Sequence, residues 1–338
     1  MRRIPSLDGL RAISIALVVL SHLIKWKHIS LAAVGAYGFL GVQIFFVLSG
    51  YLITSLLLRE YEQTQTISLR DFYIRRAYRI FPAAFVFLAM VSLLYWHEMR
   101  WYHLVAAVFY FANMDLQRPW IFGHLWSLSI EEQFYLLWPF VLRKWYRHRI
   151  AILIGVSIAS PAFIAALYAF KVKNGLIGSL PVFASHLAAG CLLAILMPKL
   201  PRIPALLALL MVAVLILIPW FPAINRYRTL FSLFVLVPLL NISIAGIVLH
   251  VIQVPYRVLN WAPVVWLGKI SYSLYLWQEV FCSNAALHQG YFLIVPAVAC
   301  AAISYYLVEQ PMLRLRDRRS KRLASAPEPT SALNSLPA

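Results

Sequence analysis

Long apolar runs recur along the chain, and short polar, often basic segments separate them. Most runs reach about the 20 residues that a helix needs to cross the hydrocarbon core of a bilayer. The pattern predicts an all-α, polytopic membrane helix bundle of about ten transmembrane helices. The expected spans cover residues 10–26, 37–58, 77–96, 124–142, 149–170, 178–197, 204–222, 230–250, 263–283 and 291–309. Another apolar stretch, 103–114, is too short to cross, so we expect it to be re-entrant or interfacial.

Composition and charge agree with this pattern, since 62% of the 338 residues are hydrophobic and only 12% are charged. In a soluble chain the net charge of +18 would indicate a nucleic-acid partner. Here most of the basic residues fall in loops and ends that share one side of the membrane when both termini are cytoplasmic. The positive-inside rule therefore predicts N-in/C-in topology, with membrane lipids and no nucleic acid as partners.

The chain divides into two parts, a membrane domain over residues 1–312 and a cytoplasmic tail over 313–338. The tail begins with several arginines and ends in a Ser/Pro/Ala-rich stretch, so we expect it to be basic and then disordered. The first apolar run lacks a small-residue cleavage site, which predicts a start-transfer anchor that is kept. The three cysteines have no paired spacing, so neither a disulfide framework nor a metal site is expected. Nothing in the pattern indicates an oligomeric state.

A histidine lies deep in the first expected span. Arg11 and His22 are eleven residues apart, about three helical turns, so both side chains share one helix face. Their axial separation of about 16 Å is roughly half the hydrocarbon thickness. An ionisable group at that depth is costly and indicates a functional site, although a histidine that only bonds a neighbouring helix is an equally open interpretation.

Arg75, Arg76 and Arg79 cluster where the third span enters the membrane. Arg76 and Arg79 are three residues apart and Arg75 and Arg79 four apart, so each pair shares a helix face. Guanidinium groups suit phosphates, which indicates a site for an anionic cytoplasmic ligand. Positive-inside anchoring or binding of anionic lipids is the alternative explanation.

The fourth span carries a second polar concentration. Ser127, Glu131 and Tyr135 recur every four residues and form a polar stripe, while Glu132 points toward a different helix. Ser129 lies in the same span. Two adjacent carboxylates in an apolar span need partners, and an ion pair with one of the arginines would explain one carboxylate but not both.

Several segments together resemble membrane-bound acyltransferase family 3, the bacterial O-acyltransferases that modify glycans and related hydroxyl compounds. In order, the segments are SLDGLRAISI with the arginine-x10-histidine spacing, FFVLSGYLIT, RRAYRIFPA, HLWSLSIEEQFYLLWP, GKISYSLYLW and VEQP. One feature departs from the family, because many members follow the fifth segment with histidine and proline, whereas this chain has Gln278, Glu279 and Val280. Some relatives carry an additional C-terminal extracytoplasmic domain, and we expect this chain to be a stand-alone membrane module.

Acyl transfer to a hydroxyl needs an activated donor, a base, and positive charge near the developing oxyanion. The resemblance implies an acyl-CoA donor, with acetyl-CoA as the expected form, and a carbohydrate or lipid-linked glycan acceptor at the bacterial inner (cytoplasmic) membrane. His22 is expected to be the general base or a transient acyl carrier, oriented by Glu131 or Glu132. The residues expected to hold the donor are Arg11, Arg75, Arg76 and Arg79. The hydroxyls expected to contact substrate are those of Ser127, Ser129, Tyr135 and Tyr272.

Two alternatives remain open on the sequence. A polytopic transporter or flippase also combines many spans with buried charge, but no internal repeat is visible and the polar groups concentrate in the first four spans. The other alternative is an enzyme that acylates a soluble small molecule such as an antibiotic sugar. Consumption of acyl-CoA by the purified protein separates the first alternative from an acyltransferase.

Overall fold

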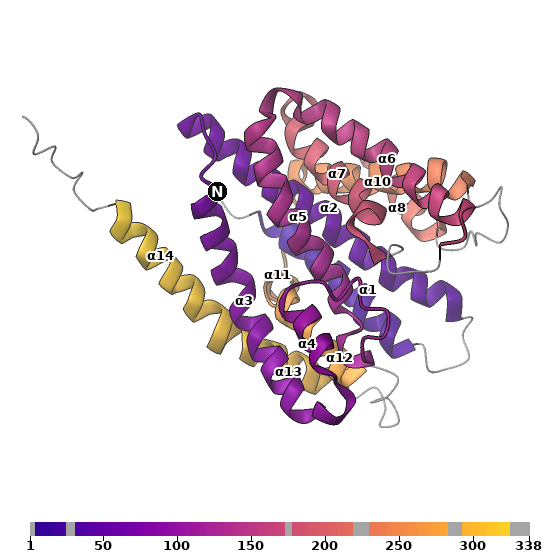
Figure 1. The fold of residues 1–338 in the computed structure, drawn as a ribbon. Coiled ribbons are helices and arrows are strands. Elements are labelled where there is room, and N and C mark those ends of the chain that lie inside the picture. Colours follow the sequence, from indigo (N-terminus) through magenta and orange to yellow (C-terminus); the bar gives the residue numbers. More distant parts are fainter. Residues whose placement is uncertain (1–3, 25–30, 173–177, 219–229, 283–292, 325–338) are drawn as a thin grey trace, which may run out of the picture.

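The computed structural model describes residues 4–24, 31–172, 178–218, 230–282 and 293–324, and within these ranges every regular element is a helix (Figure 1). The expected all-α class is confirmed. Within the described residues, each predicted span overlaps a helix or a pair of helices. In chain order these are α1 (Pro5–Ile24), α2 (Leu31–Thr64), α3 (Leu69–Leu94), α5 (Leu125–Lys144), α6 (Arg149–Ala169), α7 (Leu180–Leu196), α8 (Ala205–Leu217), α10 (Val237–Gln253), α11 (Ala262–Lys269) with α12 (Ser271–Cys282), and α13 (Ile294–Ser304).

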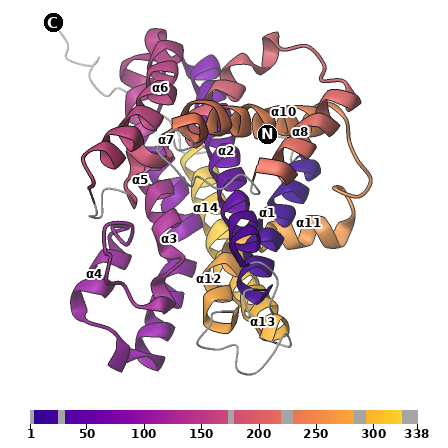
Figure 2. The same cartoon turned by 90° about the vertical axis from the view of Figure 1, so that its right-hand side faces the viewer.

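Among the described residues, six helices are long and apolar enough to cross a membrane. They are α1, α2, α3, α6, α7 and α10. The others are interrupted, shorter or more polar: α11 and α12 are separated at Ile270, α8 has 13 residues, and α5 carries both glutamates. Helix α4 (Trp101–Val108) occupies part of the 103–114 stretch and has only 8 residues, much less than a crossing needs. It lies beside α3 at one edge of the bundle (Figures 1 and 2).

Helix α2 packs between α1 and α7, and its contact with α7 depends on small residues. A methyl group added at Gly50 would collide with the backbone of α7 at Leu187, and one added at Gly190 would collide with the backbone of α2 at Val47. The two backbones therefore touch directly, as small residues allow in membrane helices. This contact fixes the position of the Ser49 side chain beside the site described below.

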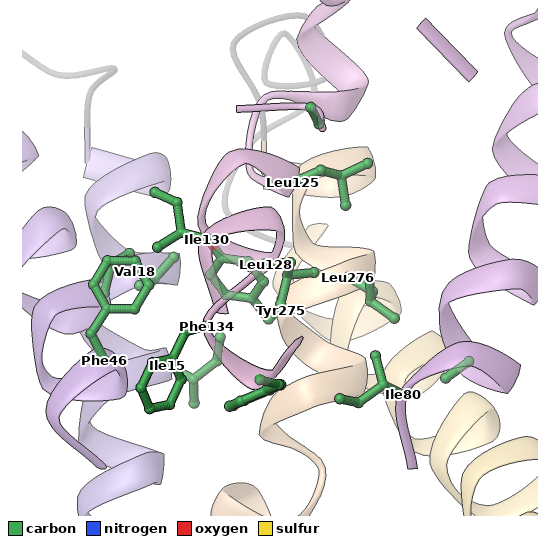
Figure 3. Packing of buried hydrophobic residues seen from close by; sticks show 14 of the residues in the cluster. Ile15, Val18, Phe46, Ile80, Leu125, Leu128, Ile130, Phe134, Tyr275 and Leu276 are labelled. Atoms are coloured by element: carbon green, nitrogen blue, oxygen red, sulfur yellow. The ribbon is translucent and has the colours of Figure 1, made fainter. Parts of the chain in front are cut away.

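A shared apolar core joins the helices that carry the polar motifs (Figure 3). Its buried side chains include residues of α1, α2, α3, α5 and α12, and also of α7 and α13, so these helices form one packed unit. The labelled members include Ile15, Val18, Phe46, Ile80, Leu128, Phe134 and Leu276. Close packing of this kind holds polar side chains on different helices at fixed mutual distances.

The turn from α2 to α3 sets the start of the arginine-bearing helix. The Ser68 hydroxyl accepts a hydrogen bond from the Asp71 amide at 3.3 Å and so caps α3. Glu60, near the end of α2, accepts a hydrogen bond from the Ser68 amide at 2.7 Å. The same carboxylate forms an ion pair with Arg75 at 2.8 Å. These contacts fix where the arginine cluster enters the bundle.

The chain closes with a π-helical turn, Tyr305–Glu309, followed by α14 (Gln310–Ala324), which packs beside α3 (Figure 1). Helix α14 runs without a break across the expected boundary at residue 312 and carries much of the basic part of the tail. Disorder was expected from about residue 320, but α14 continues to Ala324, and residues 325–338 lie outside the described residues.

Candidate active site

A polar cavity lies among α1, α2, α3, α5 and α12, with a free volume of about 90 Å³. We call it the arginine cavity. It brings together eight of the residues that the sequence indicated, from four different helices. These residues are Arg11, Arg76, Arg79, Ser127, Glu131, Glu132, Tyr135 and Tyr272. The space suffices for several water molecules, which can hydrate the charged groups, or for a small acyl group.

The three guanidinium groups of the arginine cavity are held by different contacts. Arg11 donates from Nε to the Ser271 hydroxyl at 3.2 Å. Arg76 lies over the ring of Tyr135, with its guanidinium carbon 5.1 Å from the ring centroid. Arg79 forms an ion pair with Glu309 at 3.2 Å. Three cations from two helices thus face one small space, an arrangement suited to an anion.

The two carboxylates predicted to be catalytic lie in this same cavity. Glu131 accepts a hydrogen bond from Ser49 at 2.9 Å, and the Tyr135 hydroxyl lies 3.2 Å from its other oxygen. Arg11 and Arg76 line the same cavity as Glu131 and Glu132. Glu131 thus has two hydroxyl partners, and both carboxylates share the cavity with guanidinium groups, the kind of partner that a buried carboxylate needs.

A second cavity, of about 180 Å³, lies further along α1. We call it the histidine cavity, because His22 and His124 both line it together with Glu279. The Nδ1 atom of His22 is 2.6 Å from the amide oxygen of Gln278. One oxygen of Glu279 lies 3.8 Å from Nδ1 of His22 and 3.9 Å from Nδ1 of His124. Two imidazoles thus flank one carboxylate.

The arginine cavity and the histidine cavity are neighbours, because Val42 and Tyr275 line both. The Tyr275 hydroxyl shares a hydrogen bond of 2.6 Å with Ser127 and donates to the carbonyl of His124 at 3.1 Å. Tyr275 is therefore held in place between the cationic space and the imidazole of His22.

Three of the indicated residues, His22, Arg75 and Ser129, have other partners than the sequence led us to expect. The sequence paired His22 with Glu131 or Glu132, but both glutamates line the arginine cavity, and the contacts of His22 Nδ1 in the described part of the chain are with α12. Arg75 pairs with Glu60 outside the cavity, and Ser129 donates to the carbonyl of Leu125 at 2.9 Å. The roles of all these residues stay predictions.

Sequence reasoning missed four side chains near His22 and between the cavities. They are His124, Tyr275, Gln278 and Glu279. The residues of α12 had a readable signal, because Tyr272, Tyr275 and Glu279 follow each other at spacings of three and four and so share a helix face. Gln278 departs from the family pattern, but its contact with His22 cannot be read from spacing, because the two residues are 256 positions apart.

Within the described ranges, no group of three or more His, Cys, Asp or Glu side chains is placed to hold a metal ion. Cys191, Cys282 and Cys300 are free thiols. The candidate site therefore combines arginine side chains, which can bind an anion, with the neighbouring imidazole of His22.

A helical membrane bundle with a cationic cavity next to an accessible imidazole is the arrangement expected of an enzyme that transfers an acyl group from an anionic donor. Comparison with known proteins gives the family. The family model described as an acyltransferase domain matches residues 4–308, so the chain belongs to acyltransferase family 3 and is an acyltransferase. The resemblance noted in the sequence is confirmed.

The curated relatives are bacterial O-acetyltransferases. The peptidoglycan O-acetyltransferase OatA of Listeria monocytogenes is 31% identical over 316 residues, which cover 81% of this chain and 49% of the relative. A putative O-acetyltransferase of Staphylococcus aureus is 34% identical, covering 86% and 52%. The putative peptidoglycan O-acetyltransferase YrhL of Bacillus subtilis is 30% identical, covering 92% and 55%. The chain thus spans about half the length of the curated relatives it matches, and no solved structure matches it.

Proposed function

We propose that this chain moves an acetyl group from acetyl-CoA to a hydroxyl of an envelope or exported carbohydrate. The observation that carries the proposal is the arginine cavity lying next to the histidine cavity, with Val42 and Tyr275 common to both. One cavity suits an anionic donor and the other presents an imidazole for the acceptor. The glycan acceptor is supported by the printed names of relatives from Listeria and Bacillus, which are peptidoglycan O-acetyltransferases.

Arg11, Arg76 and Arg79 are proposed to bind the phosphates of acetyl-CoA. All three line the arginine cavity, and guanidinium groups bind phosphate through paired, charge-assisted hydrogen bonds. Arg75 is 47% exposed and points to Glu60, so its proposed part is to attract the donor at the cytoplasmic entrance. Glu131 and Glu132 are proposed to position Arg11 and Arg76. Their negative charge is also proposed to weaken anion binding in the cavity enough for the product CoA to leave.

His22 is proposed to take the proton of the acceptor hydroxyl, or to carry the acyl group transiently. It lines the histidine cavity and its side chain is 25% exposed, so a substrate can reach it. Ser127, Tyr135 and Tyr272 are proposed to contact the acyl donor, because their side chains line the arginine cavity. The hydroxyl of Ser129 is already used by a backbone carbonyl, and its role stays a prediction.

The membrane arrangement follows from the same proposal. About ten spans with both termini in the cytoplasm place the arginine cluster at the cytoplasmic side, where acetyl-CoA is made, and His22 near the middle of the bilayer. The residues 1–312 form the proposed membrane domain of a bacterial inner membrane, and 313–338 form the cytoplasmic tail. The acceptor then enters from the opposite side.

The test is mass spectrometry of envelope glycans and lipids from cells with the native gene, without it, and with a His22→Ala variant. We expect a hydroxyl-bearing species to gain the mass of one acetyl group only with the native protein. If no envelope species changes while the purified protein still consumes acetyl-CoA, the acceptor is a soluble molecule and the proposed substrate class is wrong.

A further inference from the structure

The side chain of Gln278 links His22 to Glu279. Gln278 lies on α12 and is fully buried. Its amide nitrogen is 3.1 Å from a carboxylate oxygen of Glu279, and its amide oxygen is 2.6 Å from Nδ1 of His22. The three side chains therefore form a hydrogen-bonded chain that ends at the residue proposed as the base.

The direction of every hydrogen bond in this chain follows from the chemistry of its ends. An ionised carboxylate only accepts hydrogen bonds, so the amide NH2 of Gln278 must face Glu279. The amide oxygen then faces His22, and an amide oxygen only accepts. His22 must therefore carry its proton on Nδ1, which leaves the lone pair on Nε2. The hydrogen-bond partner of one ring nitrogen decides the tautomer of an imidazole in this way.

Glu279 lies near two imidazoles and one cationic side chain. The Nδ1 atoms of His22 and His124 lie 3.8 and 3.9 Å from its oxygen, and the charge of Arg118, in the loop before α5, also acts on it. The side chain of His124 is almost fully buried. The positive charge of Arg118 favours the ionised form of Glu279. An ionised carboxylate only accepts hydrogen bonds, and this fixes the orientation of the Gln278 amide.

We propose that Gln278 and Glu279 are positioning residues that hold His22 in its Nδ1–H tautomer for acetyl transfer. This inference rests on the proposed function. In the transfer step, Nε2 of His22 takes the proton from the acceptor hydroxyl as the oxygen bonds to the acetyl carbon. The thioester C–S bond breaks, and the proton passes from Nε2 to the departing thiolate of CoA. Atoms and charges balance without any further reactant.

Some substitutions at positions 278 and 279 preserve the chain of hydrogen bonds and others break it. A neutral imidazole has one donor and one acceptor, as the Gln278 amide has in this chain, so Gln278→His can accept from His22 and donate to Glu279. Gln278→Leu keeps a similar volume and offers neither group. Glu279→Gln keeps the shape but removes the group that fixes the amide orientation, because a second amide accepts or donates equally well.

The tautomer is read directly by nitrogen NMR of protein with 15N-labelled histidine, which works whether or not the protein is active. The chain has nine histidines, and the resonances of His22 are those that His22→Ala removes. We expect the native protein to show His22 protonated at Nδ1 only, and Gln278→Leu and Glu279→Gln to show a mixture with the Nε2–H form. An Nε2–H tautomer in the native protein, or an unchanged tautomer in both variants, overturns the proposal.

Kinetics supply the second readout. We expect Gln278→Leu to lower kcat by between about ten-fold and a hundred-fold, with KM for acetyl-CoA unchanged, and Gln278→His to retain kcat within about three-fold. Gln43→Leu is the matched control, because the Gln43 amide also lies against an imidazole, His186 at 3.4 Å, but lines neither cavity. It should keep kcat.

Equal loss of kcat in Gln278→Leu and Gln278→His would show a purely structural role and overturn the proposal. If Gln278→Leu does not fold, Glu279→Gln provides the same comparison. A native protein that transfers no acetyl group refutes the proposed function, while the tautomer measured by NMR still decides the present inference. The two failures are thereby distinguished.

Discussion

The ion pair between Arg79 and Glu309 allows a quantitative prediction. Arg79 lies 3.2 Å from Glu309, whose side chain is completely buried, whereas Arg79 is 28% exposed toward the arginine cavity. The other carboxylate oxygen of Glu309 is contacted only weakly, by the Ser273 hydroxyl at 3.3 Å. In Arg79→Met the buried carboxylate loses its nearest cation, and removal of one partner of a buried pair costs about 3–5 kcal/mol. The partial exposure of Arg79 places the expected cost near the lower end, at about 3 kcal/mol.

The measurement is thermal unfolding of the purified protein in detergent, followed by the fluorescence of its 11 tryptophans. For a chain of this size about 3 kcal/mol corresponds to a fall in Tm of roughly 4 °C. The double variant Arg79→Met/Glu309→Leu removes both charges and should recover most of that loss. The reasoning is refuted if Arg79→Met melts with the native protein, or if the double variant melts as low as the single one.

Three further predictions concern donor binding and packing. Arg76→Ala should raise KM for acetyl-CoA by about ten-fold or more, because a charge-assisted hydrogen bond contributes about 1.5–3 kcal/mol; an unchanged KM in steady-state assays would exclude Arg76 from donor binding. Gly190→Ala should lower Tm and the yield of folded protein, because the added methyl group meets the backbone of α2. Gly155→Ala is the control: it adds a methyl group in open space and should melt like the native protein in the same assay. Trp138→Phe should lower the free energy of unfolding by about 1–3 kcal/mol, because the buried Thr54 hydroxyl loses the indole N–H that donates to it at 2.9 Å. Adding Thr54→Val to that variant removes the unpaired hydroxyl and should restore part of the lost Tm.

The sequence was sufficient for the helices and for the composition of the arginine cavity. Runs of apolar residues must fold into helices in a membrane, because the backbone finds no other hydrogen-bond partners there. Residues three and four apart share a face, so the stripe of Ser127, Glu131 and Tyr135 was visible, and so was the pair Arg76 and Arg79. All five line the arginine cavity, although the sequence had assigned Glu131 to His22 and the two arginines to the donor.

The sequence was not sufficient for the partners of these residues across helices. Helical spacing shows which face a residue occupies but not which helix lies opposite, and Gln278 is 256 positions from His22. Arg79 shows the same limit. An ion pair with Glu131 or Glu132 was one expectation, whereas Arg79 pairs with Glu309 in the π-helical turn Tyr305–Glu309, where the regular spacing of an α-helix no longer applies.

The central claim is that His22 performs the transfer of acetyl groups from acetyl-CoA. The most direct measurement uses native protein and His22→Ala, each reconstituted in lipid nanodiscs with acetyl-labelled acetyl-CoA and soluble peptidoglycan fragments. We expect label on the fragments and an equal amount of free CoA with the native protein. In His22→Ala, transfer should fall by about a hundred-fold or more, with the affinity for acetyl-CoA retained. Full transfer by His22→Ala, at a similar level of folded protein, would contradict this mechanism.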